Sequence, residues 1–417
     1  MTEPISRMPT SAPSASWPVY IIQIITFSLI LLGTAIAILA IQVPAMLLHL
    51  GPLPFRFFAP NEFADIKLFF RKQYKTVIRT TEQAFGTCMV FIVYFLTPGT
   101  KLVITGDHDK FKSIEKTILF ANHQIYPDWV YIWMLARKYQ RHGDVKIMLI
   151  AVLKYIPILG LGMQFFDFIF MQRKLALDKI NIIENMKRQK AFAAHLPLWL
   201  MIYPEGTLNT PGNRDSTRAY AKKYDIKEDP KYVLLPKSTG LFMLSDALSK
   251  QLNSVFDLTV GYSGLEAPDI PYEEYLAQNV FFGHKYPKEI HIHVKHFQLN
   301  QLPGFEENQP LLELKSDSTS KTFVETFDAK TDQRRLNFAT WVTKRFLVKD
   351  DQMKHFYNDG SFHNAQKTDG FEESNTEEWT IAPSVHDSML LIFTWAIGYT
   401  FIRLYLAVFW LLLSFVF

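Results

Sequence analysis

A long uncharged stretch near the N-terminus constrains the fold of this chain more than any other feature. Between Arg7 and Arg56 the sequence contains no Lys, Arg, Asp or Glu. Residues 20–41 within it are predominantly apolar, and a helix of this length crosses the hydrocarbon layer of a bilayer, which is about 30 Å thick. Trp17 and Tyr20 stand where aromatic side chains anchor a helix at the membrane interface. We therefore expect a transmembrane helix at about 20–41.

A cleaved signal peptide is the alternative for this stretch. The apolar run exceeds the usual h-region of about 7–15 residues, the preceding tail is not basic, and no clear cleavage site follows. We therefore expect the helix to be retained. Residues 389–417 form a second apolar run in which Arg403 is the only charge, and one tilted span or a shallow hairpin both fit it. Residues 84–97 are short for a span, which leaves a membrane-embedded, an interfacial or a core segment.

Flanking charges predict how the first helix is oriented. The tail before it carries only Glu3 and Arg7. The positive charges that follow it are Arg56, Lys67, Arg71, Lys72, Lys75 and Arg79. Because Lys and Arg favour the cytosolic side of a membrane, we expect the middle of the chain to face the cytosol.

Composition excludes several other classes of protein. The single cysteine, Cys88, permits neither an intrachain disulfide nor a cysteine-based zinc site. A net charge of +4 over 417 residues, without a dense basic stripe, is too weak to predict nucleic-acid binding, although it suits anionic lipid surfaces. His291 and His293 would share a strand face, but no further ligand stands at a recognisable spacing, so we expect no metal site.

The middle of the chain alternates strand-like and helix-like segments. The expected strands are short, rich in β-branched or aromatic residues and bounded by turn residues; they are residues 102–106, 117–121, 198–203, 232–235, 256–262 and 289–297. The expected helices are residues 129–140, 176–194, 238–251 and 328–347. This alternation predicts an α/β fold, a mixed sheet flanked by helices, with membrane segments at both ends.

Composition shifts divide the chain into five parts. We expect a mobile Ser/Pro-rich tail at 1–16 and a membrane-associated region at 17–100. The α/β domain should then occupy 101–347, a polar linker rich in Gly, Asn and Asp 348–386, and the C-terminal membrane segment 387–417.

The segment "TILFANHQIYPDW" (residues 117–129) places two ionisable side chains after an apolar strand. On a continuous helix, His123 and Asp128 would not share a face. Pro127 disfavours helix at the residue before it and suits a first helical turn, so we expect strand, turn and helix. Asp128 could then accept a hydrogen bond from one imidazole nitrogen of His123 and leave the other free to take a proton from a hydroxyl. The alternative is that His123 caps the turn and Asp128 caps the helix, without a shared role.

Three further segments carry groups suited to an anionic ligand. In "YPEGT" (residues 203–207), Gly206 permits close backbone approach, Thr207 and the loop amides can bind phosphate oxygens, and Glu205 can hold a hydroxyl or a cation. "FIFMQR" ends in Arg173, whose fork of donors matches a phosphate. "VLLPKSTG" brings Lys237 to a helix start. Each segment alone is equally explained by an ordinary turn or helix start.

Taken in order, the segments "NHQIYPDW", "FIFMQR", "YPEGT" and "VLLPKSTG" resemble the motifs of the glycerophospholipid acyltransferase family, the 1-acylglycerol-3-phosphate acyltransferases. Further along, "FDLTVGY" and "PKEIHIHVKHF" look like its lysocardiolipin and lysophosphatidylinositol acyltransferase branch. The resemblance covers roughly residues 20–300. Tyr203 stands where many members have Phe, a change that we expect to be harmless.

The resemblance implies a membrane-bound enzyme that transfers a fatty acyl group from acyl-CoA to a free glycerol hydroxyl of a lysophospholipid. His123 would be the base and Asp128 would orient it, while Arg173, Glu205, Gly206, Thr207 and Lys237 would bind substrate. It implies no cofactor, and acyl-CoA would be a co-substrate.

Several points stay open at this stage. We expect lysophosphatidylinositol or another anionic acceptor, with lysophosphatidic acid or lysocardiolipin as alternatives. We expect the endoplasmic reticulum membrane, with lipid-droplet or mitochondrial contact as alternatives. Membrane lipids are the expected partners, and nothing predicts an obligate protein partner.

Residues 147–170 could line an acyl-chain groove or simply pack as core. A lipid-binding protein without catalysis is the alternative to an enzyme. A serine hydrolase is a third class, but the sequence lacks the Gly-x-Ser-x-Gly turn that carries the nucleophile of such enzymes.

Overall fold

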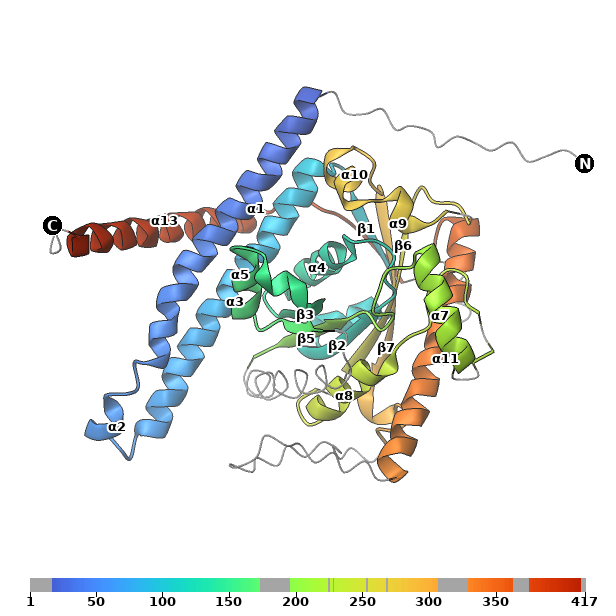
Figure 1. Ribbon diagram of the computed structural model, residues 1–417, viewed down its shortest axis with the longest axis horizontal. Coiled ribbons are helices and arrows are strands. Elements are labelled where there is room, and N and C mark those ends of the chain that lie inside the picture. Colours follow the sequence, from blue (N-terminus) through green and yellow to red (C-terminus); the bar gives the residue numbers. More distant parts are fainter. Residues whose placement is uncertain are drawn as a thin grey trace, which may run out of the picture.

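A mixed eight-stranded sheet forms the centre of the molecule (Figure 1). The computed structural model describes residues 17–172, 196–223, 226–227, 229–252, 254–267, 269–306, 329–362 and 375–413. The strands lie in the order β4-β3-β5-β2-β6-β7-β1-β8. Their bounds are β1 Lys101–Gly106, β2 Lys116–Ala121, β3 Val145–Ile150, β4 Ile169–Met171, β5 Leu198–Ile202, β6 Ser254–Tyr262, β7 Glu289–Gln298 and β8 Thr376–Thr380.

Five neighbouring strands, from β4 to β6, run parallel to one another. Of these, β2, β5 and β6 lie in the middle of the whole sheet; they are predominantly apolar and buried, as expected for strands covered on both faces. The direction reverses between β6 and β7, and again between β1 and β8. The carboxyl ends of β2, β5 and β6 therefore meet at one edge.

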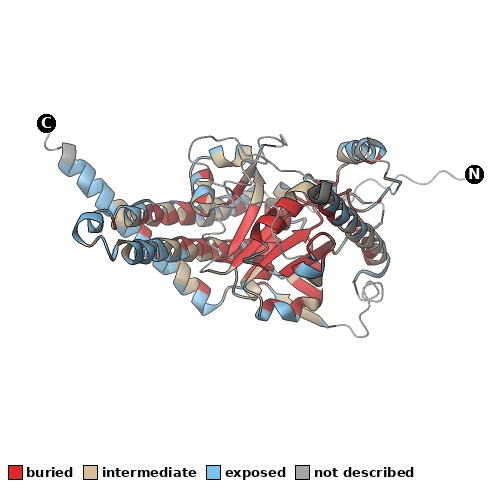
Figure 2. Ribbon diagram, turned by 90° about the horizontal axis from the view of Figure 1, so that it is seen from below, coloured by how far each residue is buried: buried red, intermediate tan, exposed pale blue. Residues whose placement is uncertain are grey.

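Helices cover both faces of the sheet (Figure 2). One face is packed by α3 (Phe63–Leu96), α4 (Asp128–Lys138), α5 (Leu159–Phe165) and α10 (Ala277–Phe282). The other is packed by α8 (Ser238–Leu248) and α11 (Ala329–Asp359). The remaining short elements are η1 Met46–His49, α2 Phe55–Phe58, η2 Asp107–Lys112, η3 Ala151–Tyr155, α7 Pro211–Lys223, α9 Pro271–Glu274 and η4 Leu299–Gln301. This arrangement confirms the predicted α/β fold.

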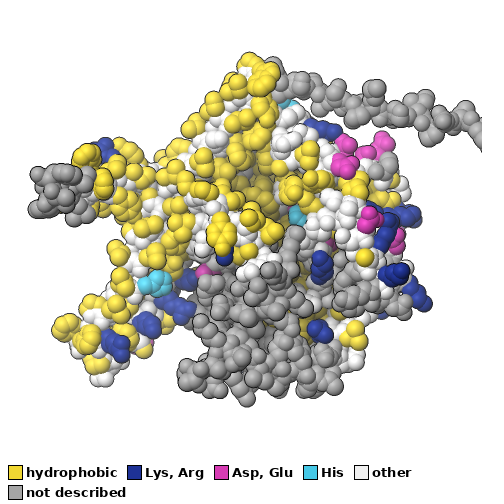
Figure 3. All heavy atoms as spheres, in the orientation of Figure 1, with side chains coloured by type: hydrophobic (Ala, Val, Ile, Leu, Met, Phe, Trp, Pro, Cys, Tyr) yellow, Lys and Arg dark blue, Asp and Glu magenta, His cyan; other side chains and the backbone are white. Residues whose placement is uncertain are grey.

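Two long apolar helices, α1 (Trp17–Ala45) and α13 (Val385–Leu413), are long enough to cross a membrane. They lie against each other, and Trp395 donates a hydrogen bond to the Thr34 hydroxyl at 3.0 Å. Gly398 permits the close approach, because a Cβ there would stand 2.6 Å from the Cα of Ala37. Most of their remaining side chains are exposed and apolar (Figure 3), which suits lipid better than water.

The helices settle two alternatives that the sequence left open. The C-terminal run is one continuous helix as far as Leu413, not a hairpin. The segment at 84–97 is the end of α3, and its side chains are largely buried against α1, α4 and α13 as part of the core.

Several expected elements differ from the structure. Residues 232–235 are not a strand, because the amides of Tyr232 and Val233 donate to the Asp350 carboxylate instead of to a neighbouring strand. Strands β3, β4 and β8 were not anticipated. Residues 348–386, expected as a linker, contain the last turns of α11 and the polar edge strand β8, which pairs with β1. The helix expected at 176–194 lies outside the described residues.

Candidate active site

The predicted site residues that the structure describes gather at the carboxyl ends of three adjacent parallel strands. Phe120 of β2 lies beside Ile202 of β5, and Ala121 lies beside Leu258 of β6. The "NHQIYPDW" segment follows β2, and the "YPEGT" segment follows β5. Parallel strands bring such loops together at one edge, which is the usual place for a ligand in an open α/β sheet.

His123 and Asp128 are hydrogen-bonded to each other. The Nδ1 atom of His123 lies 2.7 Å from Oδ2 of Asp128. Pro127 precedes the helix with a φ of −75°, and α4 begins at Asp128, so the turn folds back as the sequence predicts. The Asp128 side chain is fully buried, whereas 20% of the His123 side chain is exposed. Among the described residues, the other ring nitrogen, Nε2, has no hydrogen-bond partner.

Three further donors fix the Asp128 carboxylate. The backbone N–H groups of Gln124 and Ile125 donate to Oδ2 at 2.7 and 3.2 Å. The hydroxyl of Tyr262, at the end of β6, donates to Oδ1. Burial and the charge of Asp128 raise the pKa of Tyr262 well above its ordinary value, so it remains a donor. The carboxylate is therefore held in place by several donors and can keep the imidazole in one orientation.

The His123 ring is also held from its face. It stacks on Tyr203, with ring centroids 4.3 Å apart and planes at 23°. The preceding Asn122 exchanges two hydrogen bonds with the backbone of Val260, at 2.8 and 3.0 Å, which ties the turn to β6. Both contacts limit the movement of the imidazole.

The Glu205-Gly206-Thr207 loop lies directly beside this pair. Oε1 of Glu205 accepts a hydrogen bond from the His123 backbone N–H at 3.0 Å. Burial raises the pKa of Glu205 well above its ordinary value, although the backbone amides of His123 and Leu234 oppose this. A carboxyl group that resists ionisation repels an approaching phosphate less than a carboxylate would.

Gly206 and Lys237 meet at the exposed side of the loop. Gly206 has a φ of +70°, a conformation that favours glycine, and a Cβ there would stand 3.9 Å from Nζ of Lys237. The Lys237 backbone N–H donates to the carbonyl of Pro204 at 2.7 Å. Thr207 accepts a hydrogen bond from the Asn213 side chain at 2.9 Å. The structure therefore brings Glu205, Gly206, Thr207 and Lys237 together near His123.

One predicted site residue is not described by the structure, and two supporting residues were not predicted from the sequence. Arg173 lies outside the described residues. The roles of Tyr262 and Tyr203 as supports of Asp128 and His123 were missed, although each stands at the end of a strand that the sequence predicted. The adjacent parallel strand ends were the signal that could have found them.

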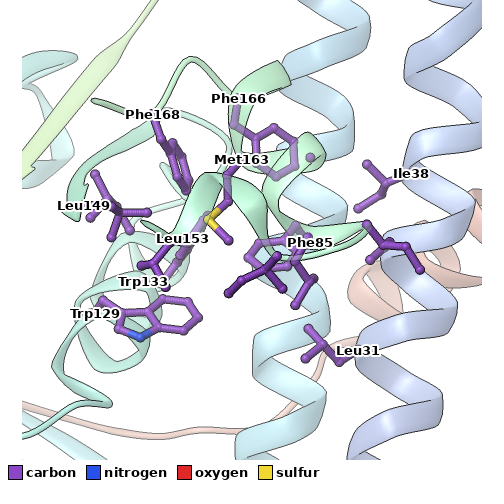
Figure 4. Close-up of a pocket in the computed structure, with 16 residues that line it drawn as sticks. Leu31, Ile38, Phe85, Trp129, Trp133, Leu149, Leu153, Met163, Phe166 and Phe168 are labelled. Atoms are coloured by element: carbon purple, nitrogen blue, oxygen red, sulfur yellow. The ribbon is translucent and has the colours of Figure 1, made fainter. Parts of the chain in front are cut away.

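An apolar cavity of about 260 Å³ is lined in part by α4, the helix that begins at Asp128 (Figure 4). Residues 147–168 supply most of its lining, and the rest comes from α1, α3 and α4. Trp129 and Trp133 of α4 face the cavity, and Asp128 begins the same helix. Leu31, Phe85 and other apolar side chains of α1 and α3 close its far side. The cavity supports the acyl-groove interpretation of the 147–170 segment.

Comparison with known proteins adds to this geometry. A family model described as "Acyltransferase" matches residues 103–263, which include both loops at the strand ends. The chain is 30% identical over 297 residues to the 2-acyl-1-lysophosphatidylinositol acyltransferase of Saccharomyces cerevisiae, an alignment that covers 63% of the chain and 68% of the relative.

The chain belongs to the glycerophospholipid acyltransferase family. Two further relatives are similar. Lysocardiolipin acyltransferase 1 of Mus musculus is 30% identical, over 64% of this acyltransferase and 60% of the relative. A probable 1-acyl-sn-glycerol-3-phosphate acyltransferase 5 of Arabidopsis thaliana is 28% identical, over 68% of this acyltransferase and 63% of the relative.

Proposed function

We propose that this acyltransferase transfers a fatty acyl group from acyl-CoA to a free glycerol hydroxyl of a lysophospholipid. The observation that carries the proposal is the His123–Asp128 pair: the pair lies beside the 205–207 loop, and Nε2 of His123 has no hydrogen-bond partner among the described residues. Among acceptors we favour lysophosphatidylinositol or another anionic lysophospholipid, because relatives with such names match 63% and 64% of the chain. Lysophosphatidic acid and lysocardiolipin are the alternatives.

In the proposed reaction, Asp128 holds the imidazole while Nε2 of His123 takes the proton of the acceptor hydroxyl. The hydroxyl oxygen attacks the thioester carbonyl, the carbon–sulfur bond breaks, and the coenzyme A thiolate recovers a proton from the imidazolium. Arg173 and the 205–207 loop with Lys237 would hold phosphate. Burying the acyl chain in the cavity would contribute about 0.8 kcal/mol per CH₂ group. The scheme uses no metal or cofactor.

We further propose that α1 and α13 anchor the enzyme in the endoplasmic reticulum membrane with its sheet domain in the cytosol. The basic residues after α1 support this orientation. Glycosylation sites introduced at the exposed residues 112–113 should remain unmodified in this orientation and become modified in the opposite one.

The experiment that tests the function is an acyl-transfer assay on membranes that carry the chain. Labelled acyl-CoA is supplied with lyso forms of phosphatidylinositol, phosphatidic acid, cardiolipin and phosphatidylcholine. We expect transfer to an anionic acceptor, and a loss of roughly 10²- to 10⁴-fold in His123→Ala, because proton transfer by a positioned base contributes that much. His355→Ala, a change at a half-exposed histidine of α11, is the matched control.

The outcomes separate the alternatives. Transfer that survives in His123→Ala would show that His123 is not the base. Release of free fatty acid without acyl-CoA would indicate a hydrolase. No transfer by folded protein would favour a lipid-binding protein.

A further inference from the structure

Arg214 lies in the first turn of α7, the helix that follows the 205–207 loop. The helix and the loop are tied together, because the side chain of Asn213 donates to the Thr207 hydroxyl and to the Leu208 carbonyl, both at 2.9 Å. Movement of the loop and of the helix end is therefore coupled. Arg214 is a cation held at a fixed place relative to the predicted substrate loop.

The Arg214 guanidinium forms no hydrogen bond or ion pair with any residue that the structure describes. The acidic groups that act on it electrostatically are Asp350, Asp229 and Glu205. Each already has a partner: Asp350 accepts from two backbone amides, Asp229 pairs with Arg218, and Glu205 accepts from a backbone amide. Within the described part of the chain, the Arg214 guanidinium is thus a donor without an acceptor.

Partial burial makes this arrangement costly for the free protein. Arg214 is only partly exposed, and desolvation is the main cause that lowers its pKa. Removing a charged group from water without a partner costs free energy, and a bound anion can offset that cost. A planar guanidinium matches the oxygens of a phosphate in particular, with two parallel hydrogen bonds.

Lys237 supplies a second cation from another element of the same loop region. It is exposed, its Nζ stands over Gly206, and this amino group has no hydrogen-bond partner among the described residues. Arg214 lies in the first turn of α7, and Lys237 directly precedes α8. The N-termini of both helices flank the loop. Two cations whose charged groups have no partner among the residues that the structure describes therefore flank a loop that contains a glycine turn.

We propose that Arg214 is a phosphate-binding residue that sets substrate affinity, and that it acts with Lys237 on the 205–207 loop. The proposal rests on the proposed function and identifies which side chain of this chain recognises the charged part of its substrate. Two substrates of that reaction carry phosphate: the lysophospholipid in its head group, and acyl-CoA in its nucleotide and pyrophosphate. The ligand chemistry is the same in both.

The test compares Arg214→Gln with the wild type and with Arg218→Gln. Arg218 is one turn further along α7, exposed, and paired with Asp215 and Asp229, so it serves as the matched control. We expect KM for one substrate to rise roughly 10- to 100-fold in Arg214→Gln, as the loss of charge-assisted hydrogen bonds predicts, while kcat changes little. Arg214→Lys should recover part of the affinity.

A change of acyl donor identifies which substrate's phosphate Arg214 binds. Each variant is assayed with acyl-CoA and with an acyl-pantetheine thioester, which has the same reacting group but no phosphate. A rise in acceptor KM with both donors would place Arg214 on the lysophospholipid. A rise in donor KM with acyl-CoA alone would place it on coenzyme A.

Unchanged KM values in folded Arg214→Gln, or an equal change in Arg218→Gln, would overturn the proposal. If Arg214→Gln does not fold, Arg214→Lys decides, because wild-type KM values in that variant would contradict bidentate binding. The wild type and His123→Ala are run alongside. An inactive wild type would count against the proposed function, whereas an active wild type with normal Arg214→Gln constants would count against Arg214 alone.

Discussion

Asp128 and Asp257 are two carboxylates buried in the same part of the sheet, with 0% and 1% of their surface exposed. Asp257 lies in β6 and pairs with Lys349 and Arg345 of α11, the latter at 2.7 Å. Lys349 is itself completely buried and also donates to the Leu258 carbonyl at 2.5 Å. Asp128 pairs instead with His123, which reaches the surface.

The difference lies in the partner rather than in the carboxylate. Asp257 belongs to a closed ion pair that joins α11 to the sheet, and nothing outside the protein can reach it. Asp128 is neutralised by two amides, a hydroxyl and an imidazole, and one nitrogen of that imidazole stays available. The first arrangement suits structural stability, and the second suits proton transfer. Variants that change one side of either pair can test this distinction.

The largest effect is expected from Asp128→Asn. An amide in place of the carboxylate can favour the wrong tautomer of His123, so acyl transfer should fall roughly 10³- to 10⁴-fold. The melting temperature should change little, because the two amide donors keep an oxygen to bind. Transfer rate and thermal unfolding are measured on the same preparation, with Asp109→Asn at an exposed site as the control. Normal activity in Asp128→Asn would contradict the role of Asp128 in proton transfer by His123.

Lys349→Met should have the next largest effect, on stability. Removing one member of a buried pair leaves Asp257 without its closest cation, which typically costs about 3–5 kcal/mol of folding free energy. The measurement is thermal or denaturant unfolding in detergent. The control is Lys344→Met on the exposed side of the same helix, which should unfold like the wild type. A Lys349→Met protein as stable as Lys344→Met would show that the closed pair is not structural.

The smallest of the three effects is expected from Tyr262→Phe. Loss of one hydrogen bond to Asp128 should lower acyl transfer roughly 10- to 100-fold, as a charge-assisted bond is worth about 1.5–3 kcal/mol. The rate of acyl transfer by membranes that carry each variant is the measurement.

Tyr131→Phe is the matched control for this prediction. The Tyr131 ring lies 5.8 Å from the Tyr262 ring, and its hydroxyl has no hydrogen-bond partner within the described part of the chain. Its rate of acyl transfer should match the wild type. A similar fall in rate in both variants would mean that Tyr262 supports the packing of the site rather than the position of the Asp128 carboxylate.

The parts that could be predicted from sequence depend on local chemistry. His123 and Asp128 are five residues apart, and Pro127 between them fixes where α4 begins, so their contact follows from a short segment. The central strands are buried on both faces and read as apolar runs. The same local reasoning predicted the turn after β5, where Gly206 adopts the positive φ.

The parts that could not be predicted depend on distant segments. Tyr262 reaches Asp128 from a strand 134 residues further along the chain. β8 is a polar edge strand, so it lacks the apolar pattern of the strands that were found, and only its pairing with β1 defines it. The 232–235 segment has strand composition, but its amides bind Asp350 of α11, a partner that sequence alone did not identify.

The pairing of β8 with β1 and of α13 with α1 has a consequence for biosynthesis. Each pair joins one part of the chain to another that is made much later. At about 5–20 residues per second, synthesis from β1 to β8 takes on the order of tens of seconds. During that time the outer edge of β1 has no neighbour, and α1 lacks its helical partner. A chain that stops before residue 376 keeps both defects permanently, so quality control should treat a short C-terminal truncation as a failure of the whole molecule.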